Sequence, residues 1–143
     1  MNNLVLQHFY IVRHGDHDHS YEKNPLTTEG KQQIVNASKG ICQDMKQSGL
    51  PKKIHIFTGP SHRTVQSAWV SKEELEKLIQ GVNVVVEEKN ELIIQTGGIV
   101  ELINETTTSH NILYGHEQDL GLAAFKFGKD MYFEHGQWLR IDK

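Results

Sequence analysis

The sequence has little cysteine, no excess of positive charge and no long apolar run. Cys42 is the only cysteine among 143 residues, which excludes an intrachain disulfide and a metal cluster built on several thiolates. The 15 Lys and Arg against 18 Asp and Glu give a formal net charge of -3. This balance argues against a general affinity for nucleic acid or for an anionic membrane. No stretch approaches the length of a membrane span.

The N-terminal stretch carries neither the basic start nor the long apolar core of a secretory signal, so we expect a cytoplasmic protein. Hydrophobic residues make up 37% and charged residues 23%, as in ordinary soluble globular chains. The length suits one domain over residues 1–143. Nothing in the sequence indicates the oligomeric state.

Strand patterns alternate with helix patterns along the chain. We predict strands over 4–12, 54–57, 82–86, 112–114 and 131–141, and helices over 28–48, 61–80, 99–103 and 120–127. This alternation is typical of the α/β class. It predicts a three-layer α/β/α sandwich with a mainly parallel central sheet.

The two longer helices have recognisable starts and apolar faces. Thr27 or Thr28 can cap the first helix, and its apolar residues recur at three- and four-residue steps: Ile34, Ala37, Ile41 and Met45. Ser61 can cap the second helix. A capping-box pattern over residues 71–74 predicts that this helix restarts or bends there. We expect Trp69 in the core.

Cationic side chains follow three of the predicted strands. Arg13 and His14 end the first strand, Arg63 lies just past the second, and His116 follows the strand over 112–114. Because parallel strands end at the same edge of a sheet, we expect these side chains to converge. Arg63 would lie in the first turn of a helix, where free N–H groups favour an anion. The ligand that such a site suits is a phosphoryl group.

Several fragments in this order resemble the histidine phosphatase superfamily, which includes the phosphoglycerate mutases and the small SixA-type phosphohistidine phosphatases. The fragments are Arg13-His14-Gly15, Pro25-Leu26-Thr27-Thr28-Glu29-Gly30, Gly59-Pro60-Ser61-His62-Arg63-Thr64-Val65-Gln66-Ser67-Ala68, Asn90-Glu91-Leu92 and Gly115-His116. The resemblance implies a phosphoglycerate mutase-like fold. It also implies a phosphatase that needs neither metal nor cofactor.

The resemblance also implies the roles of the convergent residues. His14 would be the nucleophile that forms a phosphohistidine, Arg13 and Arg63 would hold the phosphoryl oxygens, and His116 would stabilise the charge of the transition state. The physical reasoning agrees, since phosphoryl transfer depends mainly on positioning and charge neutralisation.

The proton donor to the leaving group is less defined. Glu91 resembles the acid of the mutase-like branch, and Asp16 and Asp18 are its rivals. We also expect Gly15 and His17 to contact the substrate.

The sequence departs from the family pattern in ways that bear on function. Gly59 stands where the family usually has serine, and Glu117 follows the second histidine. Few residues follow His116, so we expect the inserts that cover the pocket in mutases to be lacking. An open pocket suits a phosphorylated small molecule or a phosphohistidine protein. The alternative is a catalytically weak phosphate- or partner-binding module on the same fold.

A metal site is a third hypothesis. His14, His17 and His19 alternate with Asp16 and Asp18, and such side chains can bind zinc. The spacing matches no known metal motif, however, so we expect no metal. Five other histidines have no expected role: His8, His55, His62, His110 and His135.

Overall fold

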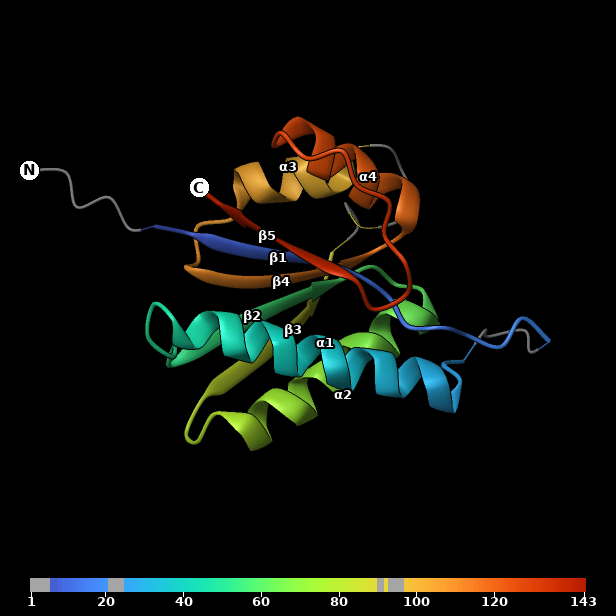
Figure 1. Ribbon diagram of the computed structural model, residues 1–143, viewed down its shortest axis with the longest axis horizontal. Coiled ribbons are helices and arrows are strands. Elements are labelled where there is room, and N and C mark those ends of the chain that lie inside the picture. The colour runs from blue at the N-terminus through green and yellow to red at the C-terminus, as the bar shows by residue number, and fades with distance from the viewer. Residues whose placement is uncertain (1–5, 21–24, 90–91, 93–96) are drawn as a thin grey trace, which may run out of the picture.

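The computed structural model describes residues 6–20, 25–89, 92 and 97–143. In these ranges a five-stranded sheet lies between two pairs of helices (Figure 1). In chain order the elements are β1 (His8–Arg13), α1 (Thr28–Lys46), β2 (Lys53–Thr58), α2 (His62–Leu78), β3 (Asn83–Glu88), α3 (Gly98–Glu105), β4 (His110–Gly115), α4 (Glu117–Lys126) and β5 (Trp138–Asp142). None of these helices has the length and apolar character needed to cross a membrane.

The strand order is β3-β2-β4-β1-β5. The first four strands pair in parallel, and β5 runs antiparallel to β1 at the edge. Helices α1 and α2 cover one face of the sheet, and α3 and α4 cover the other (Figure 1). The predicted three-layer α/β/α sandwich is therefore confirmed. The last strand is shorter than predicted, because Gly136 adopts a positive φ of 78° and the pairing begins only after it, at Trp138.

Strand β1 contributes side chains to both cores of the molecule. Tyr10 and Val12 pack in the cluster under α1 and α2, whereas Phe9 and Ile11 pack in the cluster under α3 and α4. Burial on both faces explains why the strand reads as an unbroken apolar run.

Helix α1 forms as predicted. The Gly30 N–H donates to the Thr27 hydroxyl at 2.9 Å, which makes Thr27 the N-cap. The apolar face expected from the spacing, from Ile34 to Met45, is buried.

Helix α2 differs from its prediction in two ways. It runs without interruption through Ser71, so the predicted restart is wrong. Ser71 is fully buried, and its hydroxyl accepts a hydrogen bond from Ser38 of α1 at 3.0 Å instead of capping a helix. Trp69 was expected in the core but is 52% exposed, since it lies on the face of α2 turned away from the sheet.

Candidate active site

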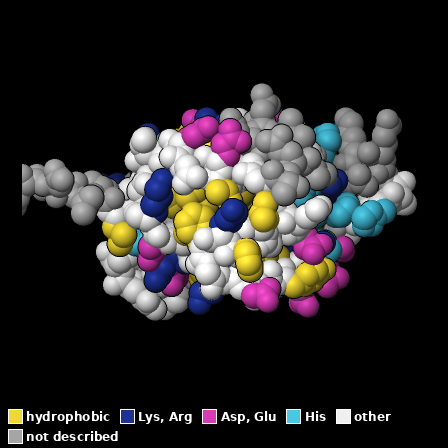
Figure 2. All heavy atoms as spheres, turned by 90° about the horizontal axis from the view of Figure 1, so that it is seen from above, with side chains coloured by type: hydrophobic (Ala, Val, Ile, Leu, Met, Phe, Trp, Pro, Cys, Tyr) yellow, Lys and Arg dark blue, Asp and Glu magenta, His cyan; other side chains and the backbone are white. Residues whose placement is uncertain are grey.

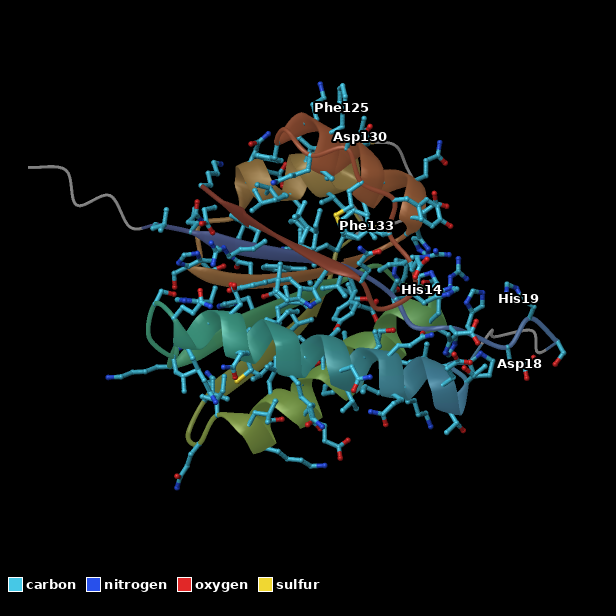
Figure 3. The ribbon with its side chains drawn as sticks, viewed as in Figure 1. His14, Asp18, His19, Phe125, Asp130 and Phe133 are labelled. Carbon is cyan, nitrogen blue, oxygen red and sulfur yellow. The ribbon has the colours of Figure 1, made fainter. Side chains whose placement is uncertain are left out.

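The register between β1 and β4 brings two of the predicted site residues together. Arg13 pairs with Gly115, so the residue after each strand, His14 and His116, lies at the same carboxyl edge. The His14 N–H points to the Gly115 carbonyl at 3.4 Å. The two imidazole rings lie 5.2 Å apart, centroid to centroid. Figure 3 shows His14 where β1 ends.

Arg63 extends this pair from the first turn of α2. Its Nη2 lies 3.4 Å from Nδ1 of His116. A guanidinium only donates, so Nδ1 of His116 is the acceptor and the ring proton lies on Nε2. Burial, followed by the charge of Arg63, lowers the pKa of His116 to about 4. His116 is therefore a neutral hydrogen-bond donor near pH 7.

His14 is held in one tautomer. Its Nδ1 lies 2.9 Å from the carbonyl oxygen of Gly15, which can only accept, so Nδ1 carries the proton and Nε2 keeps its lone pair. Only 3% of His14 is exposed. Burial lowers the pKa of His14 to about 3, with smaller contributions from His116 and Arg63. Burial therefore does more than the neighbouring cations to keep this ring neutral.

Both arginines keep a donor free. Arg13 Nη1 donates to the Phe133 carbonyl at 2.8 Å, which fixes one side of its guanidinium. The Nε atoms of Arg13 and Arg63 are buried and have no acceptor in the described part of the chain. Phosphoryl oxygens are acceptors that match such donors in charge and geometry.

Gly15 lies against the start of α1. A Cβ on Gly15 would come within 3.0 Å of the Gly30 carbonyl, and a Cβ on Gly30 would come as close to the Asp16 backbone. The Gly15 N–H donates to the Ser67 hydroxyl at 3.1 Å, and Ser67 donates to the Arg63 carbonyl at 2.7 Å. Gly15 thus connects the loop that carries His14 to α2. Its contact with substrate stays a prediction.

The carboxyl groups proposed as proton donors differ in position. Asp16 accepts from the Thr27 hydroxyl at 3.1 Å at the start of α1. Asp18 lies farther out on the loop (Figure 3), where it accepts two hydrogen bonds from Ser20 that lower the pKa of its carboxyl. That environment suits a capping carboxylate rather than an acid. Glu91 lies outside the described residues.

Two further histidines lie beside His14. The ring of His17 is 5.2 Å and the ring of His135 is 5.5 Å from that of His14. Histidine side chains gather at one end of the molecule, with acidic side chains beside them (Figure 2). His135 was expected to have no role. It lies between α4 and β5, in a segment without a motif. The only signal in the sequence was the glycine at 136, which ends the segment in a turn.

A cavity of about 360 Å³ opens beside this cluster, lined by Arg13, Gln33, Tyr132, Glu134 and His135. A larger depression of about 780 Å³ shares four of these residues, all except Arg13, and continues along α1 to Trp138. Arg13 is the predicted site residue that lines the smaller cavity, next to His135.

The packing around Gly59 leaves no room for the serine that the family usually has at this position. A Cβ there would come within 3.0 Å of the Leu92 carbonyl, so a serine at this position requires the backbone at residue 92 to move. Glu117 lies in the first turn of α4, directly after His116. A carboxylate there is favourable for the helix dipole.

Comparison with known proteins identifies the fold. No model of a protein family matches the sequence, and no protein of the curated collection matches it. Solved structures do match. A candidate phosphohistidine phosphatase SixA from Nakamurella multipartitia is 14% identical, with a TM-score of 0.72, and the match covers 96% of this chain and 84% of that one.

Two further structures agree. The protein histidine phosphatase SixA complexed with tungstate is 19% identical, with a TM-score of 0.65 and 94% of each chain covered. A candidate phosphohistidine phosphatase SixA from Agrobacterium tumefaciens is 13% identical, with a TM-score of 0.61 and coverage of 87% of this chain and 77% of that one. The chain therefore has the same fold as these SixA structures.

Proposed function

We propose that this protein is a phosphatase that hydrolyses phosphoryl groups without metal, through a phosphohistidine at His14. The observation that carries the proposal is the state of His14. It is a buried, neutral imidazole whose Nδ1 proton is held by Gly15, so that the lone pair of Nε2 is available for attack. The fold that the chain shares with the tungstate complex of SixA adds support, since tungstate is a tetrahedral oxyanion like phosphate.

In the first step, Nε2 of His14 attacks phosphorus, the N–P bond forms, and the bond from phosphorus to the leaving group breaks. Arg13 and Arg63 would hold the phosphoryl oxygens through donors that include their free Nε groups. His116 would donate its Nε2 proton to an equatorial oxygen. These groups neutralise the charge that builds on the phosphoryl oxygens.

In the second step, water attacks the phosphohistidine, the N–P bond breaks, and inorganic phosphate leaves. His14 then returns to its neutral form. The proton released by the attacking water goes to the group that protonated the leaving group, so the acid of the first step is regenerated.

We propose a phosphohistidine protein as the substrate. The leaving group would then be an imidazole, which needs less help from a general acid than an alcohol does. This agrees with the position of Asp16 and Asp18, whose oxygens accept hydrogen bonds from Thr27 and Ser20. The open cavity beside Arg13 suits a side chain presented by another protein. A small phosphoester is the competing substrate.

Trapping the intermediate tests the mechanism. The protein is incubated with a radiolabelled phosphohistidine peptide, quenched with alkali and digested, and the labelled peptide is identified by mass spectrometry. We expect an acid-labile, alkali-stable label on the peptide that contains His14. The His110→Gln variant, altered at the start of β4 and so at the opposite end of the strands from His14, should label like the wild type. Label on another residue, or turnover without any label, would contradict the proposal.

The Glu91→Gln variant separates the two substrate classes. If Glu91 is the acid, hydrolysis of an aryl or alkyl phosphate should fall by about a hundredfold, while hydrolysis of phosphohistidine should change little. Equal losses on both substrates would show that Glu91 serves binding or folding instead.

A further inference from the structure

Three histidines from separate parts of the chain converge around one point. His14 ends β1, His17 lies in the loop that follows, and His135 lies in the segment that precedes β5. One ring nitrogen of each lies within 4.8 Å of the other two. The phosphoryl chemistry proposed above gives no role to His135, so this convergence needs its own explanation.

Each of the three rings has a nitrogen that is free to bind. Nδ1 of His17 and Nε2 of His135 are buried atoms without a hydrogen-bond partner in the described part of the chain. His14 donates Nδ1–H to the Gly15 carbonyl, which leaves Nε2 with its lone pair. Metal-binding histidines are commonly oriented in this way, by a backbone carbonyl that accepts from the other ring nitrogen.

The geometry suits a small ion with nitrogen ligands. In a tetrahedral zinc site the ligand nitrogens lie roughly 3.3 Å apart, since each is about 2.0–2.1 Å from the metal. The three rings must therefore move closer than they are here. His17 and His135 are only half-buried and lie outside helices and strands, so their side chains can make this movement. His14 is fixed and sets the position of the ion.

The surrounding charges are mixed. The positive charges of Arg13 and Arg63 oppose a bound cation. The charge of Arg13 is felt at His135 and that of Arg63 at His17. The negative charge of Asp16 favours a cation at both of these histidines, and the negative charge of Glu29 favours one at His135. Such a site does not favour Mg²⁺ or Ca²⁺, which need several oxygen ligands. Three imidazoles favour Zn²⁺.

We propose that His14, His17 and His135 bind one Zn²⁺ ion, and that the bound ion inhibits the enzyme by occupying Nε2 of His14. The fourth position of the ion would be open to water or to inorganic phosphate. This site differs from the His/Asp set that the sequence suggested, because His135 takes the place of His19 and the two aspartates. The binding of zinc stands on the geometry alone. Its inhibitory effect rests on the proposed phosphatase function.

Binding is measured by calorimetry, with ZnCl₂ titrated into the metal-free, full-length protein. We expect one Zn²⁺ per chain, and affinity at least about tenfold weaker in His135→Gln and in His17→Gln. His110→Gln, which removes a half-buried histidine at the start of β4, at the opposite end of the strands from His14, should bind like the wild type. No stoichiometric binding, or unchanged affinity in both site variants, would overturn the site.

Inhibition is measured with the same proteins on an aryl phosphate, each relative to its own rate without zinc. The wild type should lose activity at the zinc concentration that saturates the calorimetric site and recover it with EDTA. His135→Gln should need at least about tenfold more zinc for the same loss. Saturation without inhibition would overturn the regulatory part. If no variant, wild type included, turns over any substrate, the proposed function fails, and the calorimetry still decides whether the zinc site exists.

Discussion

The carbonyl oxygen of Gly30 occupies the place where a side chain on Gly15 would begin. This close approach joins the loop that carries His14 to the first turn of α1. The Gly30 carbonyl fills the space at Gly15, and the Asp16 backbone fills the space at Gly30. Both glycines belong to the fragments that carry the family resemblance. Glycine is needed at both positions because neither has room for a Cβ.

Gly30→Ala should lower the free energy of unfolding by about 1–3 kcal/mol, because its Cβ would overlap the Asp16 backbone. Gly121→Ala is the matched control. It lies in α4, the nearest atom to its Cβ is the Met131 carbonyl at 3.8 Å, and alanine favours helix. Urea unfolding of the two variants measures the difference. Equal midpoints would show that the contact between the loop and α1 relaxes easily.

Ser67→Ala should reduce turnover more than it reduces stability. The variant leaves the buried Gly15 N–H without its acceptor, which costs about 1–3 kcal/mol, and loosens the residue that orients His14. Ser71→Ala, also buried in α2 but bonded to Ser38, should lose stability and keep its turnover number. Urea unfolding and kcat on an aryl phosphate separate the two effects. Equal kcat values in the two variants would remove the positioning role of Ser67.

Arg63→Lys should lower kcat by about a hundredfold or more, although the charge is kept. Lysine lacks the fork that can contact His116 with one nitrogen and a phosphoryl oxygen with another. Arg140→Lys, in a surface ion pair with Asp44, should leave kcat unchanged. The affinity for vanadate, measured by inhibition, should fall in the first variant only. A wild-type rate in Arg63→Lys would exclude Arg63 from the chemistry.

Stability should fall as the pH falls below about 6.5. Burial depresses the pKa of folded His14 to about 3, whereas the unfolded chain titrates near 6.5. The unfolded state therefore binds more protons between these values, so the folded state is fully favoured above pH 6.5 and loses on the order of a few kcal/mol by pH 3.

His14→Gln should flatten this dependence, because glutamine does not titrate. The free energy of unfolding is measured from pH 7 to pH 4 in the presence of a chelator. An identical slope in the wild type and in His14→Gln would contradict the buried, neutral state of this ring.

The sequence predicted that the candidate site residues lie close together, because a simple geometric rule applies to them. Parallel strands end at one edge, so the residues that follow β1, β2 and β4 had to approach one another, and Arg13, His14, Arg63 and His116 do so. The apolar period of α1 likewise predicted its buried face.

What could not be predicted depends on tertiary contacts. His135 reaches the site because the segment before β5 folds back over β1, where the Gly136 N–H donates to the Arg13 carbonyl at 3.0 Å. Ser71 does not cap a helix because its hydroxyl instead accepts a hydrogen bond from Ser38, far away in the sequence. Trp69 is exposed because no element covers its face of α2 in the described part of the chain.

The most direct test of the account is turnover of para-nitrophenyl phosphate by metal-free protein, with His14→Ala beside the wild type and vanadate as inhibitor. We predict activity in the wild type that vanadate inhibits, and none in His14→Ala, whose circular dichroism spectrum should remain that of a folded protein. Activity that persists in folded His14→Ala would contradict a phosphohistidine mechanism. Vanadate binding without turnover of this ester or of a phosphohistidine peptide would instead identify a phosphate-binding module.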